Sequence, residues 1–193
     1  SGSNLGARPR VGRKAAEKYM SATPTRADAG GRRSPGEHYL ALHLGMFVSD
    51  SAYAWGLPDP QQNVGKLNVG VTYRVGEWVN SMDLGVRVDY QSFSLGEGQA
   101  SKLSFMPVLT FPDASAKFPL YFGAGLGPGV FLKQISNKSS ISLDYQLFAG
   151  VRIFDMIGAT GFFVEAGLKN HFSLLSSGQF NGTFAVAGAV FTF

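Results

Sequence analysis

The residue pair best suited to catalysis in this sequence is His171 and Ser173, which are separated by one residue. Residues two apart on a β-strand point to the same side, so the imidazole could activate the Ser173 hydroxyl as a nucleophile. No carboxylate follows Ser173 in the sequence to orient the histidine, although Glu165 shares the face of His171. A histidine near a strand end is more often structural, so we expect no enzyme activity.

Other chemical sites are poorly supported by the residue types. The chain has no cysteine, which excludes a disulfide scaffold, a thiolate metal site and a cysteine nucleophile. Its three histidines, His38, His43 and His171, lack the spacing of a zinc site. Glycines at 123, 125, 127 and 129 have strand spacing with no helix after them, so they do not form a phosphate-binding loop. We therefore expect no metal and no cofactor.

Charge divides the 193 residues into two parts. Residues 1–36 contain eight Lys or Arg against two Asp or Glu, a net charge of +6, whereas residues 37–193 contain nine against eleven, or −2. The first part is rich in Gly, Ala, Ser and Arg and poor in large apolar residues, so we expect a basic, mostly disordered tail. Such a tail could bind nucleic acid or anionic lipid. Tyr19 is its one aromatic residue, which argues against nucleic acid.

The elements that must position these residues are strands, because the hydrophobic period after residue 37 is two. The alternation is clearest at 82–91, where Met82, Leu84 and Val86 lie on one face and Asp83 and Arg87 on the other. No apolar run is long enough for a transmembrane helix. Eight segments alternate in this way: 39–48, 66–75, 82–91, 102–111, 120–127, 143–153, 162–171 and 183–193. Eight successive strands without helices predict an antiparallel up-and-down barrel with no free edge.

Either a soluble or a membrane barrel could have this alternation, and the polar face distinguishes them. A soluble barrel would cover its exterior with Lys, Glu and Thr, but here the polar face has many glycines and only isolated charges. Glycine suits a narrow interior, where it makes room for a large side chain from across the lumen. The apolar face also carries aromatic residues such as Tyr73, Phe111 and Phe162, as expected at membrane interfaces. We therefore predict that residues 37–193 form an all-β, eight-stranded transmembrane barrel; the alternative is a soluble ligand-binding barrel.

Charged residues on the polar face would then lie inside the barrel. We expect a polar network in the lumen formed by Arg74, Asp83, Arg87, Asp89, Asp144, Arg152, Glu165 and Lys169. Lys66 and Lys102 have the same strand parity and are also expected to point inward. Because eight strands enclose a space that side chains can fill, we expect paired charges that largely plug it. Large side chains, arginines included, should cover the column of Gly123, Gly125 and Gly127. A narrow channel for small solutes is the alternative.

The end of the sequence, with Phe191 and Phe193, resembles the C-terminal signal of Gram-negative outer-membrane proteins. The runs 121–129 and 162–168 are similar to small barrels of the OmpA/OmpW-like superfamily. This resemblance implies a Gram-negative outer membrane, an envelope-structural or surface-interaction role, and periplasmic termini. It implies contact with outer-membrane lipid and lipopolysaccharide, recognition of Phe191 and Phe193 by the barrel assembly machinery, and a periplasmic contact of the basic tail. Outward loops are expected at 49–63, 95–102, 133–141 and 173–182. Pro107 departs from the pattern and predicts a bulge or strand end.

A second resemblance concerns His171 and Ser173. The H-x-S pair near the penultimate strand is similar to that of lipid A deacylase barrels, which would make His171 and Ser173 catalytic. In that family an asparagine follows the serine, whereas this sequence has Leu174. The family's pair also faces lipid, but His171 shares the parity of Glu165 and Lys169. A deacylase-like enzyme is therefore the alternative to a non-enzymatic barrel.

Overall fold

The computed structural model describes residues 38–79, 81–116 and 118–193. The predicted basic tail at 1–36 lies outside the described residues. Eight long strands of 14 to 17 residues, one two-residue strand and one short 3-10 helix make up the described chain. Their bounds are β1 Tyr39–Tyr53, β2 Gln61–Gln62, β3 Gly65–Trp78, β4 Met82–Leu95, β5 Gly98–Phe111, η1 Ala114–Ala116, β6 Leu120–Lys133, β7 Ile141–Ile157, β8 Thr160–Ser173 and β9 Gln179–Thr192. No helix in these ranges is long and apolar enough to cross a membrane.

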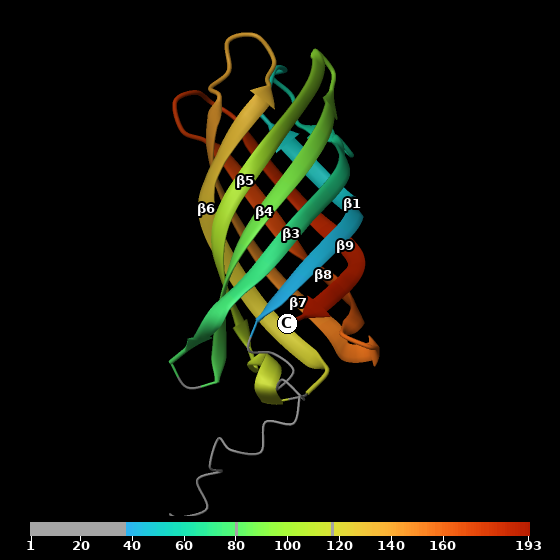
Figure 1. Cartoon of the computed structure of the whole chain (residues 1–193). Helices are drawn as coiled ribbons and strands as arrows, with labels where there is room; N and C mark the ends of the chain where they lie inside the picture. Colours follow the sequence, from blue (N-terminus) through green and yellow to red (C-terminus); the bar gives the residue numbers. More distant parts are fainter. Residues whose placement is uncertain (1–37, 80, 117) are drawn as a thin grey trace, which may run out of the picture. The chain divides into compact units, whose positions relative to one another are not determined.

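The eight long strands pair in sequence order, and β1 also pairs with β9, which closes the sheet into a barrel. Every pairing is antiparallel, and the closing register runs from Tyr39 opposite Thr192 to Tyr53 opposite Gln179. Figure 1 shows the strands tilted around the barrel, with the C-terminus at the end where β1 begins. We call this end the terminal end and the opposite end the loop end. The predicted closed up-and-down barrel is confirmed.

Alternation along each strand places apolar side chains outside and polar ones inside. On β4, Val86 is 43% exposed, whereas the next residue, Arg87, is buried. The same alternation recurs on the other long strands, where exposed leucines, valines and phenylalanines face outward. The barrel therefore has an apolar outer surface and an interior of charged, amide and aromatic groups. This is the orientation that the sequence predicted.

Connections at the loop end are shorter than expected, because the strands extend further than their alternating segments. Only residues 96 and 97 separate β4 from β5, where a loop over 95–102 was expected. Residues 134–140 and 174–178 form the next two loops. The longest loop joins β1 to β3 and contains β2, which pairs with the last residues of β1. Paired strands therefore form most of the wall at this end.

Pro107 lies within β5, and the prediction of a bulge or strand end there is wrong. Its pairing with Val86 belongs to an unbroken register between β4 and β5. Toward β6 the ladder stops at Ser104 opposite Gly129 and resumes in the same register at Val108 opposite Gly125. The missing proline donor is therefore accommodated by a gap in one ladder, without a shift of register.

Candidate functional site

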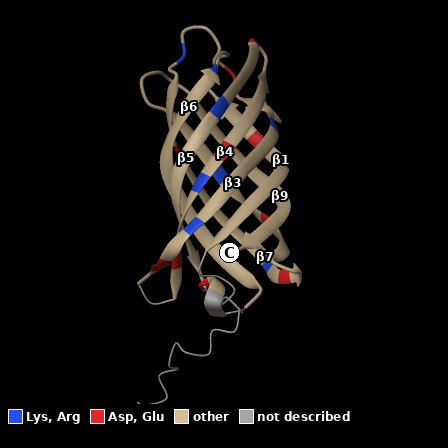
Figure 2. Cartoon of the chain, viewed as in Figure 1, with Lys and Arg blue, Asp and Glu red and all other residues tan. Residues whose placement is uncertain are grey.

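The candidate site is the set of ionisable side chains inside the barrel. All eight residues of the predicted network are buried there: Arg74, Asp83, Arg87, Asp89, Asp144, Arg152, Glu165 and Lys169. His43 and Lys102 are also buried there and form ion pairs with members of this network. Figure 2 shows that residues of both signs recur along the height of the barrel. Because an unpaired buried charge is costly, the contacts of these groups decide what the interior can do.

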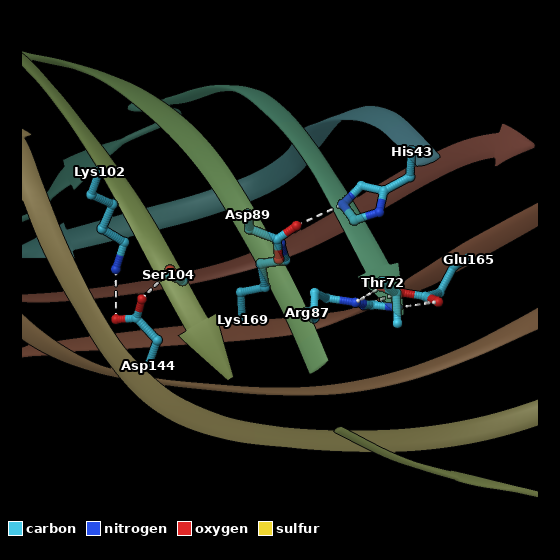
Figure 3. A network of polar contacts seen from close by, with 9 residues as sticks. All are labelled: His43, Thr72, Arg87, Asp89, Lys102, Ser104, Asp144, Glu165 and Lys169. Carbon is cyan, nitrogen blue, oxygen red and sulfur yellow. Dashed lines mark hydrogen bonds and ion pairs between the residues drawn. The ribbon is translucent and has the colours of Figure 1, made fainter. Parts of the chain in front are cut away.

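The central contact is a bidentate ion pair between β4 and β8. Arg87 Nη1 and Nη2 donate to the two carboxylate oxygens of Glu165, at 2.6 and 3.0 Å. The Tyr121 hydroxyl donates to Glu165 Oε2 at 2.8 Å, and Arg87 Nε donates to Thr72 Oγ1 at 2.8 Å. The Arg87 guanidinium also lies 4.5 Å from the centre of the Phe148 ring. Strands that are not neighbours in the sheet are thus joined across the lumen (Figure 3).

A second cross-lumen contact is centred on Asp89. Its Oδ1 lies 2.7 Å from His43 Nε2, and its Oδ2 accepts from Lys169 Nζ at 3.2 Å. His43 belongs to β1 and Lys169 to β8, so three strands meet at one carboxylate. From the sequence, His43 was assessed only as a metal ligand, so this contact with Asp89 was not predicted. The available signal was its position on the inward face, between Ala41 and Gly45.

Asp144 holds the third cluster, which is nearer the loop end. Lys102 Nζ donates to Asp144 Oδ1 at 2.6 Å and to Ser142 Oγ at 3.1 Å. Ser104 donates to the other oxygen of Asp144. The predicted network omitted Lys102, although the sequence placed it on the inward face. Figure 3 shows the Lys102, Ser104 and Asp144 side chains directed toward one another.

At the terminal end, Asp83 receives two arginines. Arg74 Nε donates to Asp83 Oδ1 at 2.7 Å, and Arg152 Nη2 lies 3.9 Å from Asp83 Oδ2. Arg152 also donates to the Tyr39 hydroxyl at 3.0 Å and stacks 4.5 Å from the centre of the Tyr121 ring. Each of the eight predicted residues therefore has an oppositely charged partner within the barrel.

The glycine column on β6 is covered by apolar side chains, so the expectation of arginines there is wrong. A Cβ at Gly123 would lie 2.3 Å from the Phe148 ring, and one at Gly125 would lie 2.7 Å from Val108. At Gly127 the nearest side chain is that of Met106. Gly123 and Gly125 provide space for these side chains, whereas Gly127 allows the β5 backbone at Phe105 and Met106 to approach closely. Arg87 packs on the ring of Phe148 instead of on the glycines.

An aromatic cluster fills the interior near the loop end. Trp55, from the loop after β1, is only 3% exposed, and its ring lies 5.1 Å from Phe93 and 5.5 Å from Phe131. Phe180 packs 4.9 Å from Phe93, and Trp55 Nε1 donates to Gln134 Oε1 at 2.9 Å. Sequence reasoning assigned Trp55 to an outer loop but missed this inward packing. Its apolar environment and hydrogen bond satisfy both parts of the indole.

His171 and Ser173 lie at the loop end of β8, and no hydrogen bond joins their side chains in the described residues. His171 is 4% exposed and packs on Phe93 and Phe180 inside the barrel. Its Nδ1 has no hydrogen-bond partner in the described part of the chain. Ser173 ends β8, and its backbone N–H donates to the carbonyl of Gly178. The pair therefore faces the lumen, as its parity with Glu165 indicated.

Lys66 points outward, so its prediction as an inward charge is wrong. The register between β3 and β4 shifts between Gly65, opposite Phe93, and Asn68, opposite Gln91. One extra residue on β3 forms a bulge, which places Lys66 and Leu67 both on the outside. Strand parity alone cannot reveal such an insertion.

The two phenylalanines predicted as an assembly signal lie at the terminal end. Phe191, on β9, is opposite Leu40 of β1 and faces outward. Phe193 follows β9, donates its backbone N–H to the carbonyl of His38 and lies 6.3 Å from the Tyr73 ring. Their recognition by an assembly machinery stays a prediction.

Two interior cavities border these clusters and are small. One, of about 20 Å³, lies among Tyr39, Arg87, Tyr121 and Arg152, and it is about large enough for one water molecule. The other, of about 10 Å³, lies beside Trp55 and other members of the aromatic cluster. Among the described residues, no group of three or more His, Cys, Asp or Glu could hold a metal ion.

The fold and interior define a closed eight-stranded antiparallel barrel with an ion-paired core. No protein-family model matches the chain, and no curated protein matches it. Among solved structures, it is similar to the N-terminal β-barrel domain of OprF from Pseudomonas aeruginosa. The identity is 12% and the TM-score 0.45, and the match covers 80% of this chain and 98% of that one. The function proposed below therefore rests on the geometry of the barrel.

Proposed function

We propose that this protein is a non-enzymatic barrel of a Gram-negative outer membrane, with an envelope-structural or surface-interaction role and a largely plugged lumen. The observation that carries this proposal is the distribution of charge on the outer surface. Only four charged side chains of the described strands are exposed, Lys66, Glu77, Lys133 and Asp155, and all four lie near strand ends. Between them the surface is a band without charge.

Apolar side chains cover that band on every long strand. Examples on successive strands are Leu44, Val69, Val86, Phe105, Leu126, Leu147 and Val164. A water-soluble barrel would leave this surface exposed to solvent at great cost, whereas lipid tails match it. The closed sheet also leaves no free edge in the bilayer, which is the condition for strands to cross it. These two features support a transmembrane position.

The plugged lumen is supported by the contacts inside. The Arg87–Glu165 pair and the Asp89 cluster join strands across the interior, and the aromatic cluster around Trp55 fills its loop end. The two cavities that border the ionic and aromatic clusters are each of about single-water size. A non-enzymatic role is supported by the burial of His171, which removes the candidate nucleophile's base from the lipid side.

Membrane extraction tests the transmembrane proposal directly. The full chain should stay in the membrane fraction after a high-pH wash, which releases peripheral proteins, and should dissolve only with detergent. The physical reason is the uncharged outer band, which must remain covered by lipid or detergent. Protein that stays monodisperse in buffer without detergent would contradict the proposal and favour a soluble ligand-binding barrel.

Planar bilayer recordings test the plugged lumen. The inserted full chain should show no steady, large conductance, because cross-lumen ion pairs and the Trp55 cluster leave no continuous path. A truncated chain beginning at Glu37 should behave in the same way. A stable porin-sized current from both would refute the plug and favour the channel, and a current from the truncated chain alone would make residues 1–36 the plug.

A further inference from the structure

A groove on the outside of the barrel, near the loop end, is lined by both polar and apolar groups. It crosses β3, β4, β5 and β6 and has a volume of about 380 Å³. Its lining includes Lys66, Tyr90, Ser92, Gln99, Ser101 and Lys133. The apolar band lies next to it on the same strands, so the groove marks the change from an apolar to a polar outer surface.

The ladder registers place the lysines at opposite sides of this groove. Lys133 on β6 is opposite Ser101 on β5, and Ser101 is opposite Ser92 on β4. Ser92 Oγ in turn accepts a hydrogen bond from the backbone N–H of Leu67 on β3, at 3.2 Å. Neighbouring strands lie about 4.8 Å apart, so three steps separate the two lysine-bearing backbones by about 14 Å.

Both lysines are turned outward by β-bulges. The β3 bulge exposes Lys66 together with Leu67, as described above. On β6 the register shifts between Lys133, opposite Ser101, and Phe131, opposite Lys102, which exposes Lys133 together with Leu132. Bulges re-aim side chains where a binding site needs them. Here two separate bulges each turn a lysine toward one groove.

Neither ammonium group has a carboxylate partner within 4.0 Å in the described part of the chain, in contrast to the lysines of the interior. Lys66 Nζ donates to the backbone carbonyl of Asn63 at 3.1 Å. The charge of Asp50 acts on Lys66, but the Asp50 carboxylate is buried and accepts the N–H groups of Val64 and Gly65. Both lysines can therefore bind an external anion.

Apolar groups continue from the groove toward the terminal end. The outward residues that follow are Val69 on β3, Val88 on β4, Leu103 and Phe105 on β5, and Val130 on β6. A ligand that fits this surface has anionic groups at the level of the lysines and acyl chains along the apolar strands. Among the described strands, the exposed charges at the opposite end, Glu77 and Asp155, are acidic, and the exposed lysines Lys66 and Lys133 both lie at the loop end.

We propose that this groove binds the headgroup of a bisphosphorylated glycolipid of the outer leaflet, with one phosphate at Lys66 and one at Lys133. Lysine ammonium groups bind phosphate as point charges, and the Ser92 and Ser101 hydroxyls can bond to headgroup oxygens between them. The lipid's acyl chains lie against Leu103 and Val130. This inference rests on the proposed function, because it needs the loop end to face the outer leaflet.

The test measures binding of fluorescent lipopolysaccharide to the full chain in vesicles of zwitterionic phospholipid. Lys66→Gln and Lys133→Gln should each weaken binding by about tenfold, the loss expected for one charge-assisted contact. Lys138→Gln is the matched control, because Lys138 is also at the loop end but donates to the carbonyls of Ala54 and Ser177. Its binding should stay within about twofold of the parent, given its lack of contact with the groove.

Two further arms identify the ligand's source. Dephosphorylated lipopolysaccharide should bind as weakly as the Lys66→Gln/Lys133→Gln double variant, and millimolar inorganic phosphate should not displace the lipid. Three outcomes would each refute the proposed binding site. They are equal losses of binding in Lys138→Gln and the groove variants, equal binding of the dephosphorylated lipid, and displacement of the lipid by phosphate. Those outcomes in vesicle-inserted protein would leave the membrane proposal intact, whereas failure to insert at all would refute that proposal itself.

Discussion

Replacement of Glu165 by glutamine should lower the free energy of unfolding by about 3–5 kcal/mol, the cost of leaving a buried charge without its partner. The Arg87 guanidinium is buried and makes both of its terminal hydrogen bonds with Glu165. The Tyr121 hydroxyl would also lose its acceptor charge. Denaturant unfolding in detergent micelles, followed by tryptophan fluorescence, measures the change.

Two controls separate the loss of this pair from a general effect of charge. Glu97→Gln removes one carboxylate from the exposed turn between β4 and β5 and should change stability by less than about 0.5 kcal/mol. The double variant Arg87→Met/Glu165→Leu should recover most of the loss, because apolar groups of similar volume can replace a buried ion pair. If Glu165→Gln were as stable as the parent, the pair would not hold the interior together.

Replacement of Val86 by arginine should destabilise the inserted barrel by about 2–4 kcal/mol, the depth-dependent cost of a charge near the bilayer midplane. Val86 is the middle member of the outward apolar run from Met82 to Tyr90 on β4. Reversible unfolding from phospholipid vesicles is the appropriate measurement, because the cost depends on the lipid environment.

Ser94→Arg provides the comparison on the same strand and the same outer face. Ser94 lies eight residues nearer the loop end, beyond the apolar run, so arginine there should cost only about 0–1 kcal/mol. A similar effect at both positions would mean that the apolar surface is not a lipid-facing band. If Val86→Arg did not change the free energy of unfolding, the assignment of the outer and inner faces of β4 would be wrong.

If both results hold, the interior and the exterior stabilise the barrel by different means. Cross-lumen contacts such as Arg87–Glu165 hold opposite walls at a fixed distance, and the apolar band fixes the depth in the bilayer. The groove at Lys66 and Lys133 would then be the place where the barrel contacts the leaflet by charge. These features suit a rigid envelope component better than a pore.

The alternation in the sequence predicted the fold and, on most strands, which face points inward; the bulge at Lys66 is an exception. Period two is a local property, so the alternation of Val86 with Arg87 reports burial without any knowledge of neighbouring strands. Eight such segments without helices are enough to predict closure, because any free edge would be left unpaired. The same parity predicted that Arg87, Asp89, Glu165 and the other network members lie inside, and it argued against His171 as a lipid-facing base.

Tertiary structure alone decided which groups meet. Arg87 and Glu165 are 78 residues apart, and their contact depends on the tilt and register with which β1 closes on β9. Strand parity predicts whether a side chain points inward, but not its height along the barrel axis. It therefore could not identify Asp89 as the partner of His43 and Lys169. The inward packing of Trp55 depends on the path of a loop, which has no period. The outward turn of Lys66 depends on one extra residue in a ladder, and such a bulge is visible only when both strands are seen together.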